Sequence, residues 1–255
     1  MLDAGTKTAR LHKEIRYTTT RFEKAHMLLY YMTTAKWAEV ILKEQRLKLS
    51  RFHEANDPFE LNLIDSRDHG RRAIAKMIER YYTERTGMIC FGATWDNPMM
   101  WAHYADKHSG ICLGFEVEDQ LVSTMNYTDQ KIDVDLGPNL PKHGLSADLL
   151  HKILTTKSTA WASEQERRTL AQLTTPDPTN GLYYTDFGPQ IQLHAVIIGH
   201  RCAWTAAKAV ELVGEVTAPV RIWKVRPAFG RFAMVEQRQF RPVTVRPPKP
   251  SRKKP

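Results

Sequence analysis

Apolar positions along the chain form short runs of strand length, interspersed with longer stretches that have helical spacing. Residues 27–32 are an apolar and aromatic run, followed by two threonines, either of which can cap a helix through its hydroxyl. Trp37, Val40 and Ile41 then recur at i, i+3 and i+4, which predicts a helix ending near Gln45. The alternating residues 47–50 predict the next strand, and a turn follows at 56–58 because the residue before a proline avoids the α region.

A stronger helical pattern follows that turn. Its apolar stripe comprises Ile74, Met77, Ile78, Tyr81 and Tyr82, and Gly87 is expected to cap the C-terminus of this helix.

Two buried strands are predicted at 88–91 and 110–117, on either side of a short helix. Asn97 supplies an N-cap and Pro98 occupies the first helical position. Met100, Trp101 and Tyr104 recur at helical spacing in this segment, so by default we expect them to be core residues.

The second half of the chain gives similar signals. It predicts helices at 146–157 and 206–213 and strands at 167–173, 193–198, 220–225 and 232–235. Because strands and helices mix without a regular repeat, we expect an α+β fold, with one globular domain at 27–240 built on a central mixed sheet flanked by helices. The polar residues 1–26 are expected to form an extension. Residues 241–255, with five prolines and six basic side chains, are expected to be a disordered tail.

Composition narrows the class of protein further. Of 255 residues, 42% are hydrophobic and 25% are charged, which is typical of globular proteins, and no apolar run approaches the roughly 18 residues that span a bilayer. The formal net charge is +9, and the tail alone carries six basic and no acidic residues, which suggests contact with nucleic acid or an acidic protein. Three cysteines without compact spacing, together with a charged N-terminus, favour a cytoplasmic location.

Common catalytic and metal-binding motifs are missing from the sequence. The chain has no GxxxxGK[ST], GxGxxG, HExxH, GxSxG or CxxC pattern. A zinc site could be drawn from Cys90, His103, His108 and Cys112. The two histidines, five residues apart on a helix, would not share a face, and both cysteines lie in apolar strands, so we expect no metal.

The segment KSTAWASEQERR contains two carboxylates, Glu164 and Glu166, at the boundary between a predicted helix and a predicted strand. In an extended segment they would point to the same side, together with Arg168. In a helix they would diverge by about 200° and form a solvated charge run. Earlier in the chain, Asp57 and Glu60 of NDPFE are interpreted as caps of the backbone that follows them.

Several segments in order resemble a bacterial domain-of-unknown-function family, the one numbered 2971. They are NDPFE, ICFGAT, NPMMWAHYADKHSGICLGFEV, KSTAWASEQERR, QLHAVIIGH and VRIWKV, and they extend over roughly residues 28–240. The stretch WAHYADKHSGICLGFEV is the most specific of them.

A second resemblance is to the ADP-ribosyltransferase fold. Three segments of the chain follow the order of that superfamily's motifs: Tyr30-Tyr31, residues 90–94 ending in Thr94, and Glu164-Gln165-Glu166. Tyr104, between the second and the third segment, resembles the tyrosine that the superfamily has after its middle strand. The chain departs from it in having no His or Arg in the first motif and Gly92 where a serine is expected.

This second resemblance implies an enzyme that uses NAD as substrate, an ADP-ribosyltransferase or NAD glycohydrolase acting as a toxin or defence effector. Glu166 would stabilise the oxocarbenium-like transition state and Glu164 would orient the acceptor. Tyr30, Tyr31 and Tyr104, with Thr94, would contact NAD. The alternative is a non-catalytic module that binds nucleic acid or an acidic partner through the basic tail.

Overall fold

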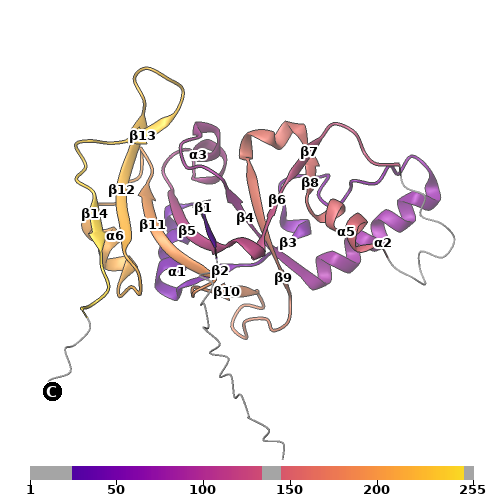
Figure 1. The fold of residues 1–255 in the computed structure, drawn as a ribbon, viewed down its shortest axis with the longest axis horizontal. Helices are drawn as coiled ribbons and strands as arrows, with labels where there is room; N and C mark the ends of the chain where they lie inside the picture. The colour runs from indigo at the N-terminus through magenta and orange to yellow at the C-terminus, as the bar shows by residue number, and fades with distance from the viewer. Residues whose placement is uncertain (1–24, 134–144, 250–255) are drawn as a thin grey trace, which may run out of the picture.

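A large curled sheet organises the molecule. The computed structural model describes residues 25–133 and 145–249 (Figure 1). In spatial order the main path of the sheet is β13 (Met234–Glu236), β12 (Val220–Pro227), β11 (Ile191–Ile198), β5 (Ile111–Glu118), β1 (His26–Thr33), β4 (Thr86–Gly92), β9 (Glu166–Gln172) and β6 (Val122–Thr124). Two further strands join it, β14 (Val243–Val245) beside β12 and β3 (Ser50–Arg51) beside β4. The pair β11 and β12 is parallel and the other pairs described in this sheet are antiparallel, so the expected α+β fold with a mixed central sheet is confirmed.

Smaller elements surround this sheet. Two short strand pairs are β2 (Arg46–Lys48) with β10 (Tyr184–Asp186) and β7 (Asn126–Thr128) with β8 (Thr156–Ser158). The α-helices are α1 (Ala35–Glu44), α2 (His69–Arg85), α3 (Pro98–Tyr104), α5 (Ala147–Leu154) and α6 (Ala206–Val213). Three short 3₁₀ segments are η1 (Phe52–Glu54), η2 (Asp119–Leu121) and η3 (Thr159–Glu164).

Side-chain caps fix the beginnings of several helices. The Oγ1 of Thr34 accepts a hydrogen bond from the Trp37 backbone N–H at 3.2 Å, and α1 ends at Gln45 in a left-handed conformation. Asn97 caps α3 in the same way, with Pro98 at its first position. These caps are local interactions: the sequence predicts the Asn97 cap, and of the two threonines that could cap α1 the structure uses Thr34.

The core consists of three apolar clusters that share the sheet. One contains Leu29, Phe91 and Leu113, with residues of α1 and α6 packed against that face. A second, around Trp101 and Trp223, includes residues of the opposite face. The third lies between the sheet and the neighbouring helices α2 and α5, and contains Phe52, Ile64, Ile78, Ile153 and Met88 (Figure 1).

Several predicted boundaries are wrong. Gly87 does not cap α2, whose C-cap is Thr86; Gly87 is instead part of β4. Within α2 only Ile78 is buried, and Met77 and Tyr81 are about half exposed, because this helix lies at one end of the molecule with a single packed side. In α1 the buried positions are Ala38, Ile41 and Leu42, while Trp37 is exposed.

The C-terminal segment also differs from its prediction. Val243–Val245 pairs with Val220–Ile222 as β14, so the tail predicted at 241–255 is structured in part. Extended β-branched residues can add a strand to a free sheet edge, which the low apolar content of the segment does not reveal. The strand expected at 232–235 begins only at Met234, and Phe232 is fully exposed in the preceding loop. Residues 250–255, and residues 1–24 of the predicted N-terminal extension, lie outside the described residues.

Candidate functional site

Three neighbouring strands bring the predicted site residues into register. Tyr30 on β1 is paired with Gly92 on β4, and Gly92 is paired with Glu166 on β9. Side chains of directly paired residues point to the same face of a sheet. Tyr30 and Glu166 therefore share a face, separated by a position that has no side chain.

A cavity of about 370 Å³ opens over this face. This volume is in the range of roughly 300–1,000 Å³ typical of small-molecule sites. Tyr30, Tyr31, Tyr104, Glu164 and Glu166 all line the cavity, so five of the six predicted site residues lie together there. Met100 lines the cavity as well. Of Met100, Trp101 and Tyr104, which the sequence pattern predicts to be core residues, only Trp101 is therefore fully buried.

The two carboxylates reach the cavity through a sharp change of backbone direction. Glu164 ends η3, Gln165 adopts a left-handed conformation with φ 45°, and Glu166 begins β9. Both glutamates are buried, with 8% and 2% of their surface exposed. The solvated charge run considered as one alternative is therefore wrong.

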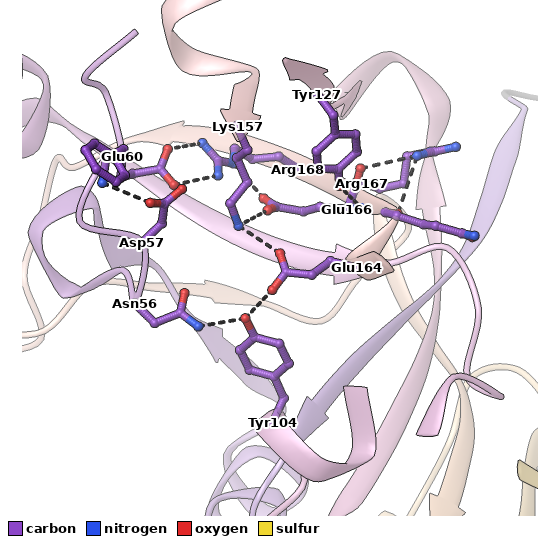
Figure 2. Close-up of polar contacts among 12 residues, drawn as sticks. Asn56, Asp57, Glu60, Tyr104, Tyr127, Lys157, Glu164, Glu166, Arg167 and Arg168 are labelled. Atoms are coloured by element: carbon purple, nitrogen blue, oxygen red, sulfur yellow. Dashed lines mark hydrogen bonds and ion pairs between the residues drawn. The ribbon is translucent and has the colours of Figure 1, made fainter. Parts of the chain in front are cut away.

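Lys157 joins the two carboxylates. Its Nζ lies 2.8 Å from an oxygen of Glu164 and 2.8 Å from an oxygen of Glu166 (Figure 2). The Nε of Arg168 lies 2.8 Å from the other oxygen of Glu166. Both oxygens of Glu166 thus bind cations, whereas Glu164 contacts one cation.

Glu60 completes this arrangement. The guanidinium of Arg168 donates to both oxygens of Glu60, at 2.7 and 3.1 Å, and to the Leu154 carbonyl at 2.9 Å. Glu60 is thus an ion-pair partner and the prediction that it caps the backbone is wrong, whereas Asp57 does accept a hydrogen bond from the Phe59 N–H. Three buried carboxylates and two buried cations leave one excess negative charge in the network of Glu60, Lys157, Glu164, Glu166 and Arg168.

Tyr104 links this network to the open part of the cavity. Its hydroxyl donates to Glu164 and accepts from the Asn56 amide at 2.8 Å (Figure 2). Burial and the Glu164 carboxylate raise the pKa of Tyr104 above its ordinary value of 10, so the phenol remains a donor. A second tyrosine, Tyr127, contacts the network through its hydroxyl, which accepts a hydrogen bond from the Glu166 backbone N–H at 2.8 Å.

The pKa values follow from burial and pairing. Burial raises the pKa of Glu166, but Arg168 and Lys157 outweigh it and hold this pKa at about 2. Burial lowers the pKa of Lys157, and Glu166 and Glu164 outweigh that effect and raise it. Cys90 is exposed where it borders the cavity, and the loss of hydration among the surrounding protein atoms, followed by the Glu166 carboxylate, raises the pKa of its thiol. At neutral pH Glu166 and Lys157 are charged and Cys90 is a neutral thiol, which is a poor nucleophile.

Tyr31 lines the first cavity and also packs against the core, whereas Thr94 lies elsewhere. Successive strand residues face opposite sides, and the Tyr31 ring packs edge-on against Phe91, 6.2 Å between centroids, on the core side of β1. Burial raises the pKa of Tyr31 to about 12. Thr94 lines a separate cavity of about 490 Å³, which has Tyr30 in common with the first.

Two residues of the site, Lys157 and Asn56, are not identified by the sequence. The pattern predicts Lys157 within a helix at 146–157, but α5 ends at Leu154 and Lys157 belongs to β8. The threonines before it favour a strand and are the signal that could have placed it. The sequence indicates Asn56 only as a turn residue.

The described residues contain neither a candidate metal-binding cluster nor a candidate membrane-spanning helix. Across residues 25–133 and 145–249, no three His, Cys, Asp or Glu residues gather in a group that could hold a metal ion. Within the same residues, no helix is both long and apolar enough to cross a bilayer.

A segment of the chain matches the model of a known family. Neither a curated protein nor a solved structure matches the chain. The model of one family matches residues 100–169, the part that contains Tyr104, Lys157, Glu164, Glu166 and Arg168. The expected family resemblance is confirmed over this segment, where the chain is similar to the family described as protein of unknown function (DUF2971).

Proposed function

We propose that the cavity binds the nicotinamide and the adjoining ribose of NAD. The protein would cleave the bond between the nicotinamide and this ribose, as an ADP-ribosyltransferase or NAD glycohydrolase. The observation that carries this proposal is the register of Tyr30, Gly92 and Glu166 on adjacent strands. Three segments that resemble the ADP-ribosyltransferase motifs in order thereby meet at one cavity.

The electrostatics suit a cationic transition state. As the C1′–N bond breaks, its electron pair goes to the nicotinamide nitrogen and positive charge develops on the ribosyl carbon. A buried cluster with one excess negative charge stabilises that carbon more than it stabilises ground-state NAD. In hydrolysis, a water oxygen then bonds to C1′ and its proton is released, so that ADP-ribose and nicotinamide are the products.

The contacts distinguish the two glutamates. Two cations already bind Glu166, which suits a positioning role: it holds Lys157 and Arg168 in place. Glu164 contacts one cation and the Tyr104 hydroxyl, so more of its charge acts on the cavity. We therefore assign the catalytic carboxylate to Glu164, with Tyr30 and Tyr104 as contacts for the nicotinamide end.

Nicotinamide release from NAD by the purified full chain tests the proposal. Glu164→Gln keeps the size and hydrogen bonds of the side chain but removes its charge, so the rate should fall on the order of 100-fold. NAD affinity should change much less, because the charge develops mainly in the transition state.

Glu84→Gln is the matched control, because Glu84 forms an exposed ion pair with Arg80 on α2. It should leave the rate unchanged, with the melting temperature of each variant verifying folding. Absence of NAD binding at millimolar concentration, or turnover indifferent to Glu164→Gln, would overturn the proposal.

A further inference from the structure

The loop between β12 and β13 exposes two large aromatic side chains. Phe229 and Phe232 are 95% and 103% exposed, far more than the other large apolar side chains described. This loop projects from the ends of its two strands (Figure 1). Fully solvated phenylalanines contribute nothing to the core, and exposed apolar groups of this kind mark interaction sites.

Cations that form no ion pair among the described residues occur in this loop and in the segment that follows it along the chain. Between residues 226 and 249 the only carboxylate is Glu236, and Arg221 binds both of its oxygens at 2.7 and 2.8 Å. Six basic residues in this range form no ion pair among the described residues: Arg226, Arg231, Arg238, Arg241, Arg246 and Lys249. The Arg226 guanidinium lies over the Phe229 ring, 4.1 Å from its centroid.

The second cavity lies next to this loop. Its volume is about 490 Å³, and its lining includes Arg231 from the loop, the aromatic residues Tyr30 and Trp95, the hydroxyl residue Thr94 and the carboxylates of Asp96 and Glu236, the second of which Arg221 binds. Flat rings with a few hydrogen-bonding groups suit a nucleobase, and the arginine that the loop contributes suits its phosphate.

We propose that the β12–β13 loop and the cations that follow it bind single-stranded nucleic acid. Exposed aromatic rings stack on bases, and arginines and lysines contact the phosphates, in proteins that bind single strands. A duplex keeps its bases stacked inside and offers no face to Phe229 and Phe232. An anionic bilayer could accept both phenylalanines and the cations, but it would not use the aromatic rings and hydrogen-bonding groups of the cavity beside Arg231. This inference does not depend on cleavage of NAD, because it uses neither glutamate of the first cavity and has only Tyr30 in common with that site.

Fluorescence anisotropy with a labelled single strand of thymidylates, and with a duplex of the same length, tests the proposal. The full chain should bind the single strand more tightly than the duplex. Phe229→Ala with Phe232→Ala should weaken single-strand binding about 10-fold or more, the order expected when base stacking is removed. These side chains are solvent-exposed, so the melting temperature should not change.

Substitutions on α2, at the far end of the molecule in Figure 1, provide matched controls. Met77→Ala with Tyr81→Ala removes two half-exposed apolar side chains and should leave binding unchanged. Arg231→Gln with Arg238→Gln should lower the slope of log Kd against log salt by about one for each phosphate that these arginines neutralise. Lys76→Gln with Arg80→Gln removes the same charge and should have less effect.

Three outcomes would overturn the proposal. The first is equal affinity for single strand and duplex with no effect of the phenylalanine variant, which would show unspecific charge attraction. The second is an equal decrease of the salt slope in the two charge variants. The third is binding to vesicles that contain phosphatidylserine with none to the single strand, which would identify a membrane surface instead.

Discussion

At the scale of single residues, the main feature of the protein is a set of buried charges that are mutually satisfied. An isolated buried carboxylate would be protonated, because burial disfavours its charged form. Glu166 stays ionised because Arg168 and Lys157 each lie 2.8 Å from one of its oxygens. Removing Lys157 or Arg168 would leave buried carboxylates without compensation, which costs more than the network itself contributes.

The pKa of Glu166 predicts how stability depends on pH. Its pKa in the folded protein is about 2, below the ordinary value of 4.5. The ionised Glu166 therefore contributes to the free energy of unfolding above about pH 4.5, and this contribution is lost as the pH falls toward 2. A pKa shift of this size corresponds to about 3 kcal/mol at most. Glu166→Gln should abolish this part of the acid dependence and lower the free energy of unfolding at pH 7 by up to about 3 kcal/mol, because the ion pairs with Arg168 and Lys157 are lost.

Urea unfolding at several pH values measures this effect. The exposed Glu84→Gln variant serves as control and should show the acid dependence of the wild type. If Glu166→Gln and Glu84→Gln behaved alike, the buried ion pairs of Glu166 would not contribute to stability.

The sequence predicts these residues unequally. Glu164, Glu166 and Arg168 are close in the chain, so an extended segment predicts that Glu166 and Arg168 share a face, as they do. Lys157, Glu60 and Asn56 reach the network only because β8 pairs with β7 and the turn after η1 packs near β9. These contacts depend on which segments pack together in the folded protein, so the local sequence pattern cannot predict them.

At the scale of elements, local signals predict helix starts correctly and sheet edges poorly. Caps at Thr34, Asn97 and Ser146 are set by neighbours within three residues, and each predicted helix start agrees with the structure. The end of α2 and the strand β14 depend on pairing with distant strands. Gly87 pairs with Ala171 and β14 pairs with β12, and neither partner is visible from the local pattern.

The strand β14 yields a prediction about truncation. A chain ending at Pro242 lacks Val243–Val245, which covers part of the outer edge of β12 and includes Val245, a residue that packs against the first core cluster. Its melting temperature should fall by roughly 2–4 °C for each kcal/mol of stability removed. A chain ending at Lys249 keeps β14 and should melt like the full chain. Equal melting of all three would show that β14 adds no stability.

At the scale of the whole molecule, the sequence predicts the class of fold but not the order of the strands. Runs of apolar residues locate β1, β4, β5, β11 and β12, and their mixture with helices indicates an α+β fold. The order in the sheet follows from pairings between segments up to about a hundred residues apart, such as β5 with β11. Periodicity carries no information on such pairings, so the cavity between β1, β4 and β9 could be expected only through the resemblance.

The shared sheet predicts that the described core unfolds as one unit. Adjacent residues of β4 serve different clusters, because Met88 faces the cluster under α2 and α5 whereas Ile89 and Phe91 face the one under α1 and α6. Neither cluster can lose its packing while β4 keeps its pairs with β1 and β9. Far-UV circular dichroism, to which α2 contributes as the longest helix described, should therefore give the same urea midpoint as fluorescence of the buried Trp101, Trp204 and Trp223. Two separate midpoints would show that the helical end of the molecule unfolds independently of the rest of the sheet.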